Sequence, residues 1–182
     1  MKKIKGFTLI EILVTVFILG ILVALMIPRI MDAIQKSKQK GTMSDMNTIS
    51  KALTDYVTDN GFLPDQNGVM DSSFVSMISV LYLKVVPLRD QWGGDLLVYT
   101  GSNVITAVPN ASPSNMSMDD FAVVSFGRNM QPDGYTQYDP DNPDLKDVFF
   151  ETDNLSSYNQ DLVVWNGSWI HAPKTARLGS GS

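Results

Sequence analysis

The chain has 182 residues, enough for one compact domain and an extension, and its formal net charge is −5 at pH 7. It contains no cysteine, which excludes disulfides and cysteine–metal sites as sources of stability. Residues 1–60 carry eight Lys and Arg against five Asp and Glu, whereas residues 61–182 carry six against fourteen. The net negative charge of the C-terminal part therefore disfavours binding to nucleic acid.

The N-terminus begins with a short basic segment, residues 1–6, which is followed directly by an apolar run over residues 7–27. As a helix this run would be about 30 Å long, the thickness of a bilayer core. A cleaved secretory signal is the alternative, but its apolar region is shorter, ~7–15 residues, and ends in small residues. Here the run ends in Met26-Ile27-Pro28-Arg29, which favours a membrane-spanning helix.

Glu11 is the one charged residue within the apolar run. A carboxylate at the centre of a bilayer costs ~2.5 kcal/mol or more, although Glu11 would lie only about 6–8 Å from the basic segment. It is therefore either an interfacial residue whose carboxylate reaches water or a charge that awaits a positive partner, since a buried carboxylate is tolerated when it is paired.

The segment from Gly6 to Glu11, Gly-Phe-Thr-Leu-Ile-Glu, has a basic leader before it and an apolar helix behind it, and it resembles the processing site of type IV prepilins. The resemblance implies that a prepilin peptidase cleaves between Gly6 and Phe7 and methylates the new N-terminus of Phe7. It also implies that Glu11 pairs with the terminal ammonium group of a neighbouring subunit when the chains polymerise into a filament.

Gly20 and Pro28 stand at positions where filament-forming members of this family often carry the same residues. Proline removes one backbone donor and clashes with the preceding turn, and glycine weakens a helix by ~1 kcal/mol relative to alanine. We therefore expect the helix to bend or extend between these two residues on assembly. A plain kink where the helix leaves the membrane is the alternative.

Basic residues flank both ends of the apolar run, so the charge distribution does not decide its orientation in the membrane. The family resemblance does, because the leader is cut on the cytoplasmic face. It implies a single-pass subunit of the inner membrane with a periplasmic C-terminal domain, which lipid surrounds before it joins a periplasmic or extracellular filament.

Residues 28–60 continue the helix as an amphipathic stalk. Asn60 and Gly61 supply the stop, because both residue types tolerate the left-handed conformation. We expect the apolar face of the stalk to pack on a C-terminal domain. Its residues recur mostly at spacings of three and four: Ile30, Ile34, Met46, Ile49, Leu53, Tyr56 and Val57.

Residues 61–178 have the short apolar segments and turn residues of a small β-rich domain, and residues 179–182 form a flexible Gly-Ser tail. We expect a second short helix over residues 74–86 and a hairpin between the first two of four strands. The strand candidates are residues 96–100, 104–108, 121–126 and 162–165. We expect the fold class to be α+β, and the resemblance to type IV prepilins implies a pilin-like fold, in which the long N-terminal helix packs on a small antiparallel sheet.

Two segments of this domain resemble the major pseudopilin of type II secretion systems. Residues 89–94 with Tyr99 are similar to its Asp-Pro-Trp-Gly-Asn-Pro-Tyr segment, although Gln91 replaces the first proline and Gly94-Asp95 replaces Asn-Pro. Residues 125–134 are similar to its Ser-x-Gly-x-Asp-Gly loop, with four residues inserted before Asp133. The match is closer in the stalk, up to Pro64.

Acidic residues gather in the loop over residues 127–161, and the resemblance implies Ca²⁺ in this region, with Asp133 and Asp161 as ligands. Asp139, Asp141 and Asp144 lie in an insert without a family counterpart and are further candidates. Ca²⁺ takes six to eight oxygens at ~2.3–2.6 Å, which aspartates and free carbonyls provide. An acidic, solvated loop that keeps a filament soluble is the alternative.

No sequence feature points to an enzyme: there is no Gly-rich phosphate loop, nucleophile elbow or zinc-ligand spacing, and the single histidine, His171, lies among apolar residues. We therefore expect a structural subunit that assembles with copies of itself. The resemblance implies a pseudopilus that drives protein export, built with minor pseudopilins, an inner-membrane platform and an ATPase. A major or minor type IV pilin for adhesion, motility or DNA uptake is one alternative, and a monomeric membrane-tethered domain is another.

Overall fold

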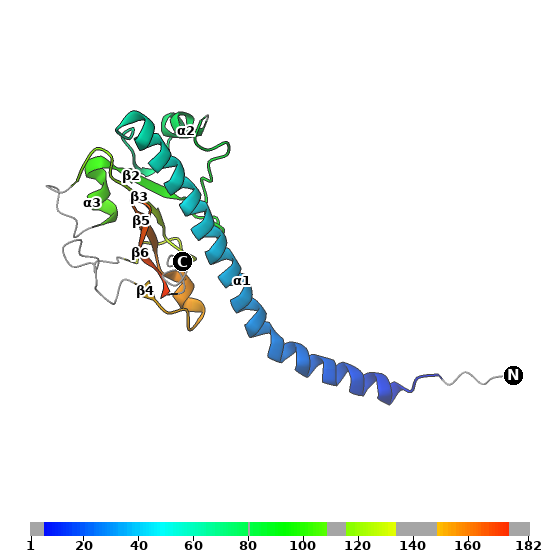
Figure 1. Ribbon diagram of the computed structural model, residues 1–182. Coiled ribbons are helices and arrows are strands. Elements are labelled where there is room, and N and C mark those ends of the chain that lie inside the picture. Colours follow the sequence, from blue (N-terminus) through cyan, green and yellow to red (C-terminus); the bar gives the residue numbers. More distant parts are fainter. Residues whose placement is uncertain (1–5, 80, 109–115, 134–148, 175–182) are drawn as a thin grey trace, which may run out of the picture.

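The computed structural model describes residues 6–79, 81–108, 116–133 and 149–174. One long helix, α1 (Leu9–Asn60), carries the domain along its upper half, while its lower half projects away from the domain (Figure 1). This arrangement confirms the α+β, pilin-like fold expected from the sequence.

Helix α1 ends at the predicted residue and begins at Leu9, two residues after the predicted start. Thr8 caps its N-terminus, and Gly61 ends it in the left-handed conformation, with φ of 77° and its N–H donating to the Val57 carbonyl at 2.7 Å. Pro28 lies inside the helix, where it removes one backbone hydrogen bond without ending it. Figure 1 shows α1 bending in its lower half, below the domain.

Within the described residues, six strands form one sheet in the order β1-β2-β3-β5-β6-β4. Neighbouring strands are antiparallel except β4 and β6, which are parallel. The strands are β1 (Asn67–Val69), β2 (Leu97–Thr100), β3 (Phe121–Ser125), β4 (Phe149–Phe150), β5 (Leu162–Trp165) and β6 (Ser168–Pro173). Three of them, β2, β3 and β5, confirm predicted strands, and they are the central, valine-rich ones.

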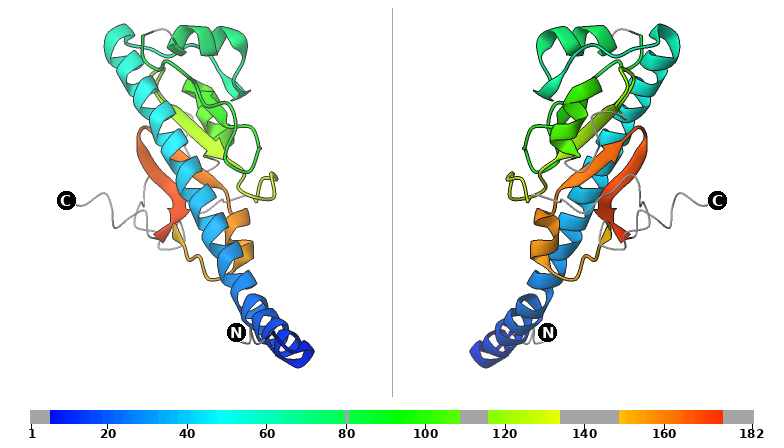
Figure 2. Two further views of the ribbon diagram at one scale, coloured as in Figure 1. Left: turned by 90° about the vertical axis from the view of Figure 1, so that its right-hand side faces the viewer. Right: turned by 90° about the vertical axis from the view of Figure 1, so that its left-hand side faces the viewer.

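Each face of the sheet is covered, so the central strands are buried on both sides. On one face Met46, Ile49 and Leu53 of α1 and residues of α2 (Ser72–Ser79) pack on Val98, Val123 and Val164. On the other face α3 (Val104–Ala107) covers Leu97, Val124 and Val163. Figure 2 shows from two sides how α1 runs along the domain and continues below it.

The predicted strand over residues 104–108 is wrong, and so is the hairpin that would have contained it. After a short 3-10 turn, η1 (Gly101–Asn103), this segment forms helix α3. Its buried residues, Val104, Ala107 and Val108, follow a spacing of three and four, which places them on one helical face against the sheet. Strand β2 pairs instead with β1 and β3.

The second helix is shorter than predicted. Helix α2 ends at Ser79 rather than at residue 86, and Asp71 Oδ1 accepts the Phe74 N–H at 2.7 Å near its start. The prediction also missed β1, β4, β6 and the 3-10 helix η4 (Leu155–Asn159). Strand β6 was detectable: Asn166 and Gly167, both with positive φ, form the two-residue turn that joins it to β5.

The apolar face of the stalk is only partly buried by the domain. Met46, Ile49 and Leu53 are fully buried, as predicted, but Ile30 and Ile34 remain 50% and 44% exposed. The prediction that these two isoleucines pack on the domain is therefore wrong: at this level the domain contacts α1 through the hydrogen bond from Tyr158 to Asp32 and leaves both isoleucines exposed. They belong instead to the exposed apolar surface of its lower half.

Candidate assembly and calcium sites

The lower half of α1 presents an uncovered apolar surface. Its large side chains are exposed from Leu9, at 83%, to Ile34, at 44%, and Phe7, just before the helix, is 82% exposed. A contiguous apolar surface of this extent requires a partner or a membrane. Within the part of the chain that is described, α1 is the one helix long and apolar enough to span a bilayer, and its apolar window is not buried by the domain.

Glu11 lies at the start of this surface and closes a capping box with Thr8. The Thr8 N–H and Oγ1–H both donate to Glu11 Oε2, at 2.8 and 2.9 Å, and the Glu11 N–H donates to Thr8 Oγ1 at 3.3 Å. The Thr-x-x-Glu spacing signals such a box, although the sequence analysis did not use it. In the single subunit the carboxylate is thus held at the first turn of its own helix, near Phe7.

The peptide bond between Gly6 and Phe7 lies outside the helix and is exposed on both sides. A peptidase can therefore reach it without unwinding α1. Further up, a Cβ added at Gly20 would meet no atom within 4 Å, so this position leaves room for a second helix to approach. The roles of Gly20 and Pro28 in assembly stay predictions.

The loop over residues 89–95 is organised by a buried aspartate. Asp90 Oδ1 accepts the N–H groups of Trp92 and Gly94, each at 2.9 Å, and Asp90 Oδ2 accepts the Ser125 hydroxyl at 2.8 Å. Gly93 has a φ of 97°, which glycine adopts without strain. Through Asp90 and Ser125 the structure therefore brings together the two segments that carry the resemblance to the major pseudopilin, within the described residues 89–94 and 125–133.

The same loop fastens the domain to the stalk. The Trp92 Nε1–H donates to Gln35 Oε1 at 2.7 Å, and the Gln91 N–H donates to Thr42 Oγ1 at 3.1 Å. Gln91, which replaces the family's proline, also donates its side-chain N–H to Asp45 Oδ2 at 2.7 Å. The departure from the family pattern thus adds a contact to α1 that proline could not make.

Lower on the stalk, Tyr158 of η4 fixes the other end of the domain to α1. Its hydroxyl donates to Asp32 Oδ1 at 2.7 Å. Burial, together with the hydrogen bond to Asp32, raises the pKa of Tyr158 to about 12. The domain is therefore held on α1 both at this point and at the loop over residues 89–95.

Gly127, two residues after Ser125, packs very closely against the backbone of residues 159–160. Its φ is 63°, and a Cβ added there would lie 2.6 Å from the Gln160 carbonyl oxygen and 2.7 Å from that of Asn159. Only glycine fits such a position. The glycine of the Ser-x-Gly resemblance is therefore a packing requirement of this turn.

Asp133 and Asp161, the two calcium ligands implied by the resemblance, do lie together. Asp161 is 2% exposed, and its Oδ2 accepts the Asp133 N–H at 3.0 Å. Its Oδ1 is buried without a hydrogen-bond partner among the described residues. Burial, assisted by the charge of Asp133, raises the pKa of Asp161 to about 7.

This donor set fits a hard cation, because an orphaned buried carboxylate oxygen is costly and a cation would satisfy it. The described residues contain no group of three or more His, Asp or Glu side chains placed to hold a metal. Further ligands would have to be backbone carbonyls, water or residues outside the described ranges. Asp139, Asp141 and Asp144 lie outside them.

His171 packs beside this pair and acts as a structural residue. It is 6% exposed, and its Nδ1 lies 2.5 Å from the Asp161 carbonyl oxygen, which can only accept. The ring therefore donates from Nδ1. Burial lowers the pKa of His171, which favours the neutral ring.

Comparison with known proteins agrees with this reading. Residues 1–27 match the family described as the prokaryotic N-terminal methylation motif. The chain is 28% identical over 135 residues to the type II secretion system core protein G of Escherichia coli K12. The aligned region covers 69% of this chain and 92% of that protein. No solved structure matches it.

Two further relatives carry the same name. The protein from Vibrio cholerae is 30% identical over 103 residues, 52% of this chain and 70% of the relative. The protein from Pseudomonas aeruginosa is 46% identical over 63 residues, 35% of this chain and 44% of the relative. With its methylation motif, its exposed apolar helix and these relatives, the chain belongs to the family of type II secretion system core protein G, the major pseudopilins.

Proposed function

We propose that the chain is a structural subunit of a type II secretion pseudopilus and that it polymerises through the lower half of α1 after cleavage between Gly6 and Phe7. One observation carries the proposal: the bilayer-length apolar run over residues 7–27 lies uncovered outside the domain, and the only charge within it is Glu11. Lipid can cover this surface in a membrane, and only other apolar helices can cover it in a filament.

Exchanging lipid for helix contacts brings little net hydrophobic gain, so packing and polar pairing must supply the specificity of assembly. Cleavage would leave Phe7 with a terminal ammonium group. Glu11 of one copy then pairs with Phe7 of a neighbour shifted by four residues, about 6 Å along the helix axis. Glu11 must leave its contact with Thr8, so the neighbour's ammonium takes the place of the cis donors.

The partners expected for filament assembly follow from the proposal. A prepilin peptidase removes residues 1–6, an inner-membrane platform and a cytoplasmic ATPase extract the subunit, and minor pseudopilins join the filament. Before assembly the chain is a single-pass protein of the inner membrane whose domain lies in the periplasm. We assign it no catalytic reaction.

The processing step is tested by mass spectrometry of the chain purified from a host with its peptidase. The expected N-terminus is Phe7 with one added methyl group, because the exposed Gly6–Phe7 bond precedes the helix. A mature chain that still begins at Met1, or one cut at another bond, would contradict the assignment.

We further propose that Asp161 and Asp133 contribute to a Ca²⁺ site, on the strength of the orphaned Asp161 oxygen. When bound, the ion supplies a counter-charge that ties Asp133 to Asp161 and β5. Ca²⁺ at about one hundred times its dissociation constant should stabilise the detergent-solubilised chain by ~2.7 kcal/mol, and a chelator should reverse the rise in melting temperature.

Asp161→Asn removes the charge and keeps the size of the side chain, so it should abolish the Ca²⁺-dependent rise. Asp119→Asn, at an exposed position away from the pair, should leave it unchanged. A melting temperature that is the same with Ca²⁺ and with chelator in the unaltered chain would overturn the calcium proposal.

A further inference from the structure

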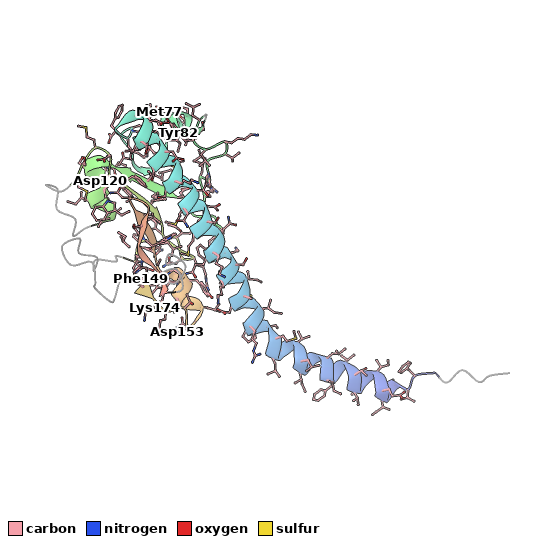
Figure 3. The ribbon with its side chains drawn as sticks, viewed as in Figure 1. Met77, Tyr82, Asp120, Phe149, Asp153 and Lys174 are labelled. Atoms are coloured by element: carbon pink, nitrogen blue, oxygen red, sulfur yellow. The ribbon has the colours of Figure 1, made fainter. Side chains whose placement is uncertain are left out.

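A groove of about 780 Å³ follows α1 beside the segment that comes after α2. Tyr82 and Leu83 form one wall, and Tyr82 is fixed by Asn60, whose Nδ2–H donates to its hydroxyl at 3.1 Å. Figure 3 shows Tyr82 at the upper end of the domain. The other wall is a stripe along one face of α1 that includes Lys40, Met43, Lys51, Ala52 and Asp55.

The groove carries two lysines on the surface of an acidic protein, and the Asp59 carboxylate lies beside Tyr82 in its other wall. Lys40 and Lys51 are exposed, and neither makes an ion pair with any residue that the structure describes. Asp55 is the one acidic residue among the lining residues, while the chain as a whole has a net charge of −5. Apolar atoms of Met43 and Ala52 lie between the charged ends. An occupant should therefore bring a carboxylate together with apolar surface.

The lower end of the domain has this composition. Asp153 is exposed there and makes no ion pair within the described ranges, whereas its neighbour Glu151 is already paired with Lys174 at 2.6 Å. Leu155, two residues further on, is 37% exposed. Figure 3 shows Asp153 at the lower end of the domain and Tyr82 at the opposite end, so the two surfaces cannot meet within one copy.

The hydrogen bond between Tyr158 and Asp32 sets the level of this lower end along α1. From Asp32 to Lys51 the helix rises about 28 Å at 1.5 Å per residue. A second copy displaced upward by this distance would bring its Asp153 level with Lys51 of the first. The displacement has the same direction as the shift of about 6 Å that pairs Glu11 with Phe7.

We propose that the groove binds the lower end of the domain of a second copy, with Asp153 of that copy against Lys51. The proposal rests on the proposed filament, because side-by-side packing of the α1 helices is what would place a second copy at this displacement. The two displacements differ severalfold, so the two contacts join different pairs of copies. The groove contact therefore fastens each subunit to one several places further along the filament.

The absence of cysteine allows a direct test by disulfide cross-linking. The full chain with Lys51→Cys and Asp153→Cys, assembled with its secretion machinery and oxidised, should give a ladder of covalent oligomers on a non-reducing gel. The matched control pairs Lys51→Cys with Asp119→Cys, which is exposed beside Asp120 toward the upper end of the domain (Figure 3), and should stay monomeric.

A charge exchange gives a second readout that does not need new cysteines. Lys51→Glu should lower the yield of filaments by about tenfold, because it sets two carboxylates against each other. Adding Asp153→Lys should restore the yield. Normal filaments from the single variant, or no rescue in the double variant, would overturn the inference, as would filaments whose Lys51–Asp153 cysteines give no ladder.

Failure of this inference and failure of the proposed function are distinguishable by electron microscopy of the same samples. Filaments that form without the Lys51–Asp153 cross-link refute the groove contact alone. If the unaltered chain forms no filament at all, the proposed function itself is refuted.

Discussion

Glu11→Ala should abolish filament formation while leaving the domain folded. Breaking a buried ion pair by removing one partner costs ~3–5 kcal/mol, so the assembled fraction should fall by at least about a hundredfold. Insertion of the single helix into the membrane should improve, because the variant no longer brings a carboxylate toward the bilayer. Electron microscopy of sheared filaments and membrane fractionation measure the two effects.

Glu11→Gln is the matched control, because Glu11 has two roles in the structure. In the single subunit it caps its own helix through Thr8, and a glutamine oxygen can accept the same hydrogen bonds. In the proposed filament it must carry a negative charge toward Phe7 of a neighbour. Loss of filaments in both variants assigns the effect to the ion pair, whereas normal filaments from Glu11→Gln would show that capping suffices.

Gly127→Ala should have the largest effect on the fold among the described glycines. The added Cβ would meet two backbone oxygens, the nearer at 2.6 Å, in a residue whose φ is 63°. Backbone strain of this kind costs ~1–3 kcal/mol, and the clash adds to it because main-chain atoms cannot rotate away. We expect the free energy of unfolding to fall by about 3 kcal/mol or more, measured by chemical denaturation of the domain in the detergent-solubilised chain.

Gly61→Ala separates the clash from the backbone strain. Gly61 has a similar φ, 77°, but a Cβ there would meet no atom within 4 Å. This variant should lose only the preference of glycine for the left-handed helix cap, about 1 kcal/mol. Equal losses in the two variants would contradict the close contact between Gly127 and residues 159–160.

The sequence predicted the elements whose pattern is long or local. The apolar run and the Asn60-Gly61 stop placed both ends of α1 closely, and the valines of β3 and β5 marked two central strands. Residues 104–108 were misassigned because a short apolar run is compatible with either a strand or a helix. Strand β1, Asn-Gly-Val, has no pattern of its own and exists through its pairing with β2.

The candidate sites divide in the same way. Glu11 was recognised directly, as the one charge in the apolar run, whereas the resemblance supplied the roles of Gly6, Phe7, Asp133 and Asp161, which stay predictions. Which carboxylates are buried depends on tertiary contacts. Only once the sheet has formed does Asp90 accept a hydrogen bond from Ser125, and only then is one oxygen of Asp161 buried without a partner among the described residues. The domain's contacts with Gln35 and Asp32 also join residues far apart in the sequence.

Gln91 shows how a departure from a family pattern can carry information. A proline at this position could make neither of the hydrogen bonds that Gln91 makes to Thr42 and Asp45 of α1. The sequence shows glutamine in place of proline, and the structure shows that this glutamine contacts α1. In this chain Gln91 therefore adds hydrogen bonds that join the loop over residues 89–95 to the stalk.

Electron cryomicroscopy of the assembled filament tests the central claim most directly. We predict that the lower halves of α1 lie together along the filament axis, with the Glu11 carboxylate within ~4 Å of the terminal nitrogen of a neighbour's Phe7. The domains should face outward. A filament held together by its domains alone, with the apolar helices in lipid and Glu11 still bound to its own Thr8, would contradict the account.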